Sequence, residues 1–243
     1  LHYPLRRQRQ MCIRDSPMTI TLLSILPEIV TDAVSIDASF AGVILDGSAL
    51  SYGSGLTIRD ADGVTIRGLQ VLGFPDNGIV LTGGASNAVI GGDRSIGTAP
   101  LGQGNLVSNN RLSGIVLEGA GTTANWLVGN YIGTDLTGEV AFGNRYVAGI
   151  AIRSGASDNV IGGDTPETCN LVSGNQAGIF LLGEETRGNT VMGNYIGIDA
   201  TGAQALGNRG EGVRIDDASD NIVGGHIEGV KNVISGNTGY GVI

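Results

Sequence analysis

One short pattern recurs along the chain and strongly constrains its fold. A glycine is followed by an aliphatic residue, any residue and another aliphatic residue, seven times from Gly55 to a shortened copy at Gly241. The later copies alternate between longer and shorter spacings, so the deeper repeat spans two units. The clearest pair is NWLVGNYIGTD at 125–135 and NTVMGNYIGID at 189–199, offset by 64 residues. Such self-similarity predicts a chain built from stacked, similar units.

Each unit of about 30 residues holds three short alternating segments, separated by Gly, Asn, Asp or Ser. Alternation over three to five residues indicates β-strands, and no helical pattern of ten or more residues is present. Three strands per unit predict a coil in which every strand pairs in parallel with its equivalents in the adjacent turns. Right-handed winding is the hand expected of parallel crossovers. We therefore predict an all-β fold, a right-handed parallel β-helix of about seven turns and roughly 34 Å in height.

Glycine and asparagine are expected at the corners of this coil. The 42 glycines make up about 17% of the chain, against a usual value of about 7%. All seventeen asparagines lie at or beyond Asn77, nearly all at strand borders. Both residue types accept left-handed backbone at tight corners. Equivalent asparagines in successive turns can also form side-chain ladders. One inward aliphatic stack is expected at Ile79, Ile115, Ile150, Ile179 and Val213.

The repeats also resemble a known family. NYIGTDLTGEVAFGN and NYIGIDATGAQALGN, with NVIGG, NLVSGN, NIVGG and NVISGN, look like the repeats of bacterial right-handed parallel β-helix proteins of the pectate-lyase-like superfamily. The likeness covers residues 17–243, because the segment 19–47 is similar to the start of such solenoids. The resemblance implies the β-helix fold and, since most members are surface or secreted proteins, an extracellular or cell-surface location. It is poor evidence for an activity.

The two ends of the chain differ from its middle. RRQRQMCIRDS at 6–16 resembles the translation of an adapter used to prepare sequencing libraries, so we interpret residues 1–16 as non-native. We assign 17–54 to the start of the solenoid and 55–243 to its repeats. The chain stops at Ile243 inside a strand motif, without the polar cap that a solenoid needs. We interpret this end as a C-terminal truncation.

Charge argues against one class of partner, and hydropathy argues against a membrane-spanning helix. The formal net charge is −9, and it becomes −12, from 10 basic and 22 acidic residues, when residues 1–16 are set aside. This acidity argues against a nucleic-acid partner. No stretch approaches the roughly 20 apolar residues that a membrane-spanning helix needs, so we expect no membrane-spanning segment in this chain.

Catalytic patterns are incomplete. The outward positions of the Gly-aliphatic strand are Thr57, Val80, Val116, Ala151, Phe180 and Arg214. All but the last lack acid–base chemistry. A polygalacturonase-like hydrolase needs paired carboxylates with a Gly-His-Gly and an Arg-x-Lys element. Here Asp216 and Asp217 are adjacent, but His226 lies in Gly-Gly-His-Ile and Lys231 is the one lysine. We therefore name no catalytic residue.

A charged cluster predicts a binding corner. Its four carboxylates follow the same strand in adjacent turns, which places them within roughly 5–10 Å of one another, with two arginines nearby. Carboxylate oxygens suit Ca²⁺, so we predict a corner that binds a hard cation or a sugar. The alternative is a solvated charged corner that keeps the column soluble. The cluster comprises Glu184, Glu185, Asp216, Asp217, Arg153 and Arg214.

Two further groups of residues repeat at strand borders. Trp126, Tyr131 and Tyr195 are predicted either to stack on sugar rings or to pack beneath a loop. Asp135 and Asp199, each in Asp-x-Thr-Gly, lie two turns apart, about 9–10 Å, which is too far to share one ion. We predict that each caps its own loop through an Asx turn. No metal-ligand set is assigned, because His, Cys and Met are scarce.

These observations favour a structural or binding segment of a secreted or cell-surface β-helix protein. Such a segment would be adhesin-like or would bind a polysaccharide or cell-surface glycan, without itself being an enzyme. The alternative is a polysaccharide lyase, hydrolase or epimerase whose catalytic turns lie partly outside this chain. A periplasmic metal-handling β-helix is a third, weaker interpretation. The feature that separates the first two is a cluster of carboxylate and basic groups on adjacent turns beside a groove.

Overall fold

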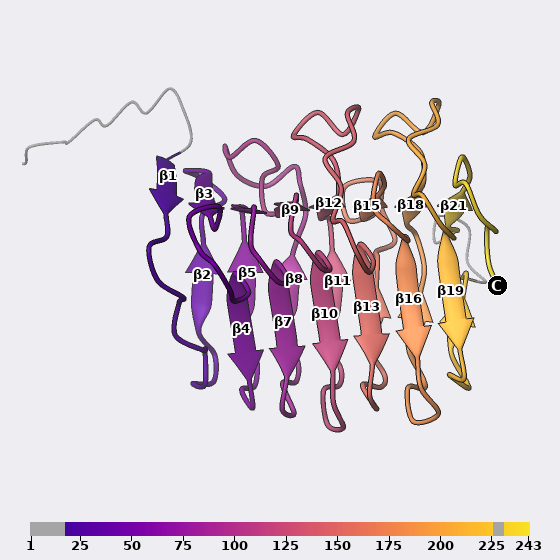
Figure 1. The fold of residues 1–243 in the computed structure, drawn as a ribbon, viewed down its shortest axis with the longest axis horizontal. Helices are drawn as coiled ribbons and strands as arrows, with labels where there is room; N and C mark the ends of the chain where they lie inside the picture. Colours follow the sequence, from indigo (N-terminus) through magenta and orange to yellow (C-terminus); the bar gives the residue numbers. More distant parts are fainter. Residues whose placement is uncertain (1–17, 226–230) are drawn as a thin grey trace, which may run out of the picture.

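The computed structural model of the protein describes residues 18–225 and 231–243. Within these ranges the chain forms strands and turns, and no helix long and apolar enough to cross a membrane is found there. Figure 1 shows the strands side by side along the long axis of the molecule. The stretch interpreted as non-native, 1–16, and His226 both lie outside the described residues.

Three parallel sheets form the sides of the coil. The eight-stranded sheet contains, in spatial order, β1 (Met18–Thr21), β3 (Val43–Asp46), β6 (Leu69–Leu72), β9 (Leu106–Ser108), β12 (Tyr131–Ile132), β15 (Leu171–Val172), β18 (Tyr195–Ile196) and β21 (Val233–Ile234). The six-stranded sheet contains β4 (Leu56–Arg59), β7 (Ile79–Thr82), β10 (Ile115–Glu118), β13 (Ile150–Arg153), β16 (Ile179–Leu182) and β19 (Val213–Asp216). The seven-stranded sheet contains β2 (Ser35–Asp37), β5 (Thr65–Arg67), β8 (Val89–Gly91), β11 (Trp126–Val128), β14 (Val160–Ile161), β17 (Thr190–Val191) and β20 (Ile222–Val223).

The register joins equivalent residues of successive repeats. Ile115 pairs with Ile79 on one side and with Ile150 on the other. The shortened last copy continues this order, because Val242 bridges to Val213. The predicted right-handed parallel β-helix of about seven turns, with three strands per turn, is confirmed. Strands β1–β3, within 17–54, join the same sheets as the later repeats.

Aliphatic side chains fill the interior of the column. The predicted inward stack is confirmed, because each of its five members has no exposed surface. Burial of one such side chain contributes about 1.5–3 kcal/mol. A second, small cluster lies on the outer face of the six-stranded sheet, where Val80, Val116 and Ala151 bury one another to 7%, 1% and 2% exposure. These positions face outward, as predicted, but they are not open to solvent.

Asparagine ladders run along all three corners of the coil. In each, the Nδ2 of one asparagine donates to the Oδ1 of the next, one turn on. The first ladder comprises Asn105, Asn130, Asn170, Asn194 and Asn232. The second comprises Asn110, Asn144, Asn175, Asn208 and Asn237. The third comprises Asn125, Asn159, Asn189 and Asn221. Among all the asparagines only Asn87 and Asn109 have positive φ, so side-chain bonding, and not left-handed backbone, accounts for the other positions.

Candidate ligand-binding groove

The second ladder positions a row of polar residues on the surface. The residue after each of the first four asparagines is exposed, and we call these four the arginine row: Arg111, Arg145, Gln176 and Arg209. Main-chain bonds hold them in register. The N–H of Arg145 donates to the carbonyl of Asn110 at 3.1 Å, that of Gln176 to Asn144 at 3.1 Å, and that of Arg209 to Asn175 at 2.9 Å. Neighbours in the row are therefore one turn, about 4.8 Å, apart.

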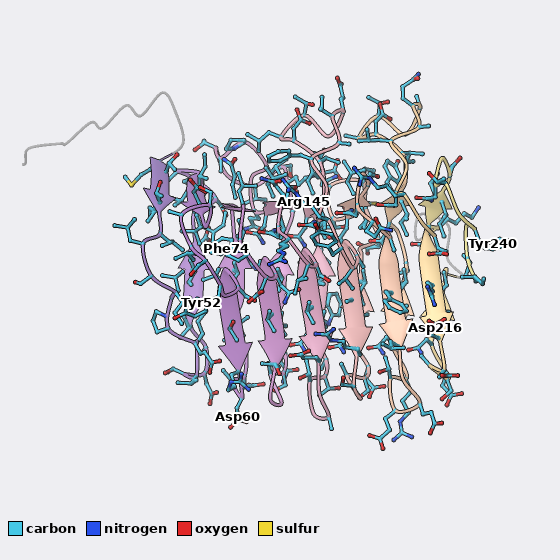
Figure 2. All side chains as sticks on the ribbon, viewed as in Figure 1. Tyr52, Asp60, Phe74, Arg145, Asp216 and Tyr240 are labelled. Carbon is cyan, nitrogen blue, oxygen red and sulfur yellow. The ribbon has the colours of Figure 1, made fainter. Side chains whose placement is uncertain are left out.

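Three adjoining hollows form a groove along this row. One, of about 510 Å³, lies between the row and the loop segments 141–143 and Gly207. A second, of about 430 Å³, extends past Arg111 to Phe74, and a third, of about 240 Å³, extends to Phe180. Tyr146 lines all three, so we treat them as one feature, the arginine groove. Figure 2 places Arg145 near the middle of the long axis, beyond the amino ends of the front strands.

Among the described residues, no carboxylate forms an ion pair with the arginines of the row. Arg145 donates from Nη2 to Asn109 Oδ1 at 2.8 Å, and the guanidinium of Arg111 lies 5.9 Å from the ring centroid of Tyr146. None of Arg111, Arg145 and Arg209 belongs to an ion pair within the described ranges. The ion pairs found there are Arg59–Glu28, Arg153–Glu118 and Arg214–Asp216. In a chain this acidic, three such arginines in line create a local positive field that attracts an anion.

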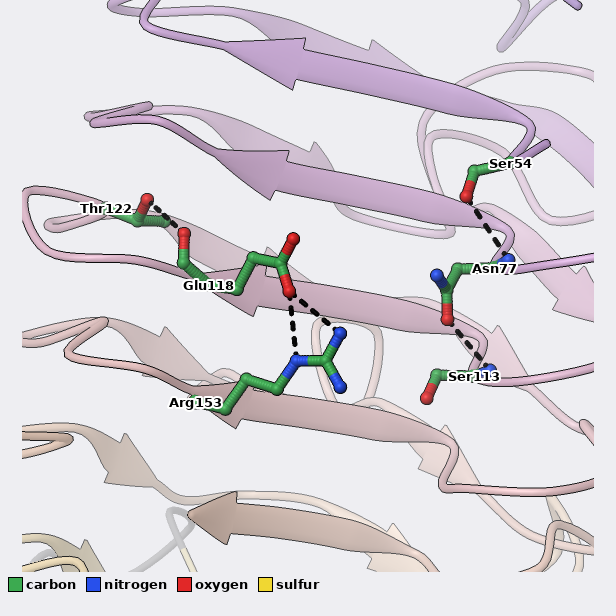
Figure 3. A network of polar contacts seen from close by, with 6 residues as sticks. All are labelled: Ser54, Asn77, Ser113, Glu118, Thr122 and Arg153. Carbon is green, nitrogen blue, oxygen red and sulfur yellow. Dashed lines mark hydrogen bonds and ion pairs between the residues drawn. The ribbon is translucent and has the colours of Figure 1, made fainter. Parts of the chain in front are cut away.

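The residues of the predicted charged corner do not converge on one point, because its two arginines form separate ion pairs. Arg153 reaches the preceding turn, where its Nη2 lies 2.8 Å from Glu118 Oε2 (Figure 3). Arg214 pairs within its own strand, with Nη2 2.7 Å from Asp216 Oδ2. Asp217 begins the turn after β19 with a φ of 51°. The two arginines thus engage different carboxylates on different turns.

The remaining carboxylates of this corner, Glu184 and Glu185, lie in the loop after β16. They line a separate hollow of about 340 Å³ together with Arg187. Across the part of the chain that the structure describes, no group of three or more His, Cys, Asp and Glu side chains is placed to hold a metal ion. Binding of Ca²⁺ or a sugar at this corner stays a prediction.

The structure brings two of the three predicted aromatic residues together. Tyr131 and Tyr195 line one hollow of about 360 Å³ on the eight-stranded sheet. A Cβ added to Gly138 would lie 2.9 Å from the Tyr131 ring, and one added to Gly202 would lie 3.6 Å from the Tyr195 ring. Each tyrosine therefore packs beneath the glycine of its own Asp-x-Thr-Gly loop. Trp126 is 51% exposed on a different sheet. Stacking of these rings on a sugar stays a prediction.

The two Asp-x-Thr-Gly loops end at the edge of the arginine groove. Asp199 accepts bonds from Thr201 Oγ1 at 2.8 Å and from the N–H of Gln204 at 3.1 Å, and Asp135 is bonded in the same way by Thr137 at 2.7 Å. Each Asp therefore caps its own loop, as predicted, but through the Thr hydroxyl and N–H groups four or five residues on, and not through the predicted Asx turn. The Gln204 N–H, with the Thr201 hydroxyl, holds the pKa of Asp199 below its ordinary value, so the carboxylate is charged at neutral pH.

The arginine row is a candidate site that the sequence analysis did not find. Its signal is the dipeptide Asn-Arg, which occurs at 110–111, 144–145 and 208–209. Three of the ten basic residues beyond position 16 therefore follow an asparagine of the second ladder. Knowing that these asparagines stack is what places the arginines in one line.

Comparisons with known proteins support the fold. The chain matches no protein-family model and no curated protein. Among solved structures it is similar to a crystal structure of a double mutant of the periplasmic alginate epimerase AlgG, with a TM-score of 0.60 and 16% sequence identity. The match covers 86% of this chain and 37% of the AlgG chain, so this chain spans little more than a third of AlgG. At this identity the likeness shows a shared parallel β-helix fold alone.

Proposed function

We propose that this protein binds an acidic polysaccharide along the arginine groove. The observation that carries the proposal is the row of arginines, for which the described residues supply no carboxylate partner. Guanidinium groups match carboxylates in a bidentate geometry. The rise of about 4.8 Å per turn is close to the length of one sugar residue in an extended chain. A polysaccharide parallel to the column axis would therefore meet successive members of the row.

Aromatic side chains in the same groove support a sugar over a small inorganic anion. Tyr146 is 66% exposed and Phe142 is 43% exposed, and both line the hollow next to the row. Exposed aromatic rings offer flat apolar faces on which the C–H face of a sugar ring can pack. A groove with a few placed polar groups beside aromatic rings is the usual form of a small-ligand site.

We further propose that the protein acts outside the cytoplasm, as a secreted or cell-surface protein. The structural neighbour is by its title a periplasmic enzyme and an alginate epimerase. Both properties belong to that protein, and they are consistent with an anionic polysaccharide as the partner of this one.

Loss of one arginine from the row tests the proposal. We expect Arg145→Gln to weaken binding to alginate or polygalacturonate about tenfold, the value of one charge-assisted hydrogen bond. Isothermal titration calorimetry at low salt measures the effect, and added salt should weaken wild-type binding. Arg187→Gln, which removes an equal charge from a distant corner, is the matched control. Equal losses from both variants, or no binding by the wild type, would contradict the proposal.

A second function, that of a lyase or an epimerase, is favoured by one observation. The phenol of Tyr146 lines the groove beside Arg145. Elimination and epimerisation both begin with removal of the proton next to the sugar carboxylate, which requires a base and a cation that neutralises the carboxylate. If the protein is such an enzyme, Tyr146→Phe retains binding and loses turnover, measured by ultraviolet absorbance of unsaturated products and by uptake of solvent deuterium. Absence of turnover in the wild type would leave binding as the function.

A further inference from the structure

The arginine row is interrupted at one turn. Its third position is Gln176, with Arg145 one turn before it and Arg209 one turn after it. Gln176 is held in place by its main chain, since its N–H donates to Asn144 at 3.1 Å and its carbonyl accepts from Gly210 at 2.7 Å. Gln176 lines both the central hollow and the hollow that extends to Phe180. An uncharged residue is therefore fixed in the groove at the turn between Arg145 and Arg209.

The surroundings of Gln176 disfavour an anion. The adjoining hollow is lined by Ala177, Phe180 and the acidic Glu211. The nearby cation, Arg214, lies over the Phe180 ring at 5.2 Å and is neutralised by Asp216 at 2.7 Å. A carboxylate placed at this turn would meet an uncharged amide and the field of Glu211, whereas one turn to either side it would meet a guanidinium that pairs with no described carboxylate.

We propose that the groove selects its ligand by the spacing of acid groups, and that Gln176 determines this specificity. The ligand class is an acidic polysaccharide in which an uncharged residue, either a neutral sugar or an esterified uronate, lies between two charged ones. Arg145 and Arg209 take the two carboxylates, about 9.6 Å apart. The Gln176 amide, which both donates and accepts, bonds a hydroxyl or an ester carbonyl between them. This inference rests on the proposed function.

The test uses oligogalacturonides of one length, either fully ionised or half methyl-esterified. We expect wild-type protein to bind the half methyl-esterified chain at least about threefold more tightly than the fully ionised one, because the Gln176 turn disfavours a carboxylate. Gln176→Arg restores an unbroken row and should favour the fully ionised chain by about tenfold. Ser219→Arg adds the same charge at an exposed position on another corner and should leave the ratio of the two affinities as in the wild type.

The outcomes separate this inference from the proposed function. If Gln176→Arg and Ser219→Arg change the affinity ratio equally, or if the wild type binds the ionised chain as tightly as the esterified one, Gln176 does not set the specificity, although the groove still binds acidic chains. If neither chain binds the wild type, the proposed function itself fails, and the inference fails with it. Circular dichroism of both variants shows whether the β-helix is intact.

Discussion

Asn144→Ala is expected to lower the free energy of unfolding by about 3 kcal/mol or more. Asn144 is 1% exposed, and its Nδ2 donates to Asn175 Oδ1 at 2.8 Å and to the Val107 carbonyl at 3.1 Å. Its Oδ1 accepts from the N–H and the Nδ2 of Asn110 at 3.1 and 3.0 Å. Alanine removes all four bonds and leaves buried donors and acceptors without partners, each at a cost of about 1–3 kcal/mol.

Urea unfolding followed by circular dichroism measures this effect. Asn87→Gly is the matched control, because Asn87 lies outside the ladders and has a φ of 50° that glycine adopts without strain. Its one side-chain bond, to Asp62, is exposed, so we expect a change below about 1 kcal/mol. Similar midpoints for the two variants would show that the ladders do not stabilise the coil.

Gly162→Ala is expected to destabilise the protein by a further mechanism, overlap of atoms between turns. A Cβ at this position would overlap the carbonyl oxygen of Met192 in the next turn, and the φ of 106° is unfavourable for alanine. Main-chain movement is the remaining way to relieve the clash, so we expect a loss of about 3 kcal/mol.

Gly224 provides a control that separates overlap from backbone strain. It has a φ of 118°, follows the equivalent strand two turns later, and has no described residue within 4 Å of an added Cβ. Gly224→Ala therefore carries the strain alone, expected at about 1 kcal/mol. The difference between the thermal unfolding curves of the two variants measures the overlap. Equal shifts would indicate that the turns are not packed as closely at Gly162 as described.

The fold was predictable because the strand motif, its aliphatic positions and its spacing all recur together along the chain. Ile115 and Ile150 occupy the same place in the same motif, so their pairing follows once the coil is recognised. The burial of Val116 was not predictable in this way. The alternation of residues along one strand is the same whether an outward side chain faces solvent or is covered by its neighbours. Only the stacking of adjacent turns determines whether such a side chain is buried.

The candidate site depends on corners, which sequence patterns describe least well. Trp126 and Tyr131 are five residues apart, yet the turn at Gly129, with a φ of 68°, and Asn130 sends them to different sheets. Conversely, Arg145 and Arg209 are 64 residues apart and share one groove. Distance along the chain was therefore a poor guide to which functional side chains meet, whereas ladder position was a good one.

The ladders also make the molecule extensible. Residues 130–193 form a two-turn cassette that enters and leaves at equivalent ladder asparagines, Asn130 and Asn194, so copies of it can be joined without changing the cross-section. Each added cassette would lengthen the column by about 9.6 Å and carry another arginine into the groove. Gene duplication can thus adjust the length of such a column, and the number of arginines along its groove, in fixed steps.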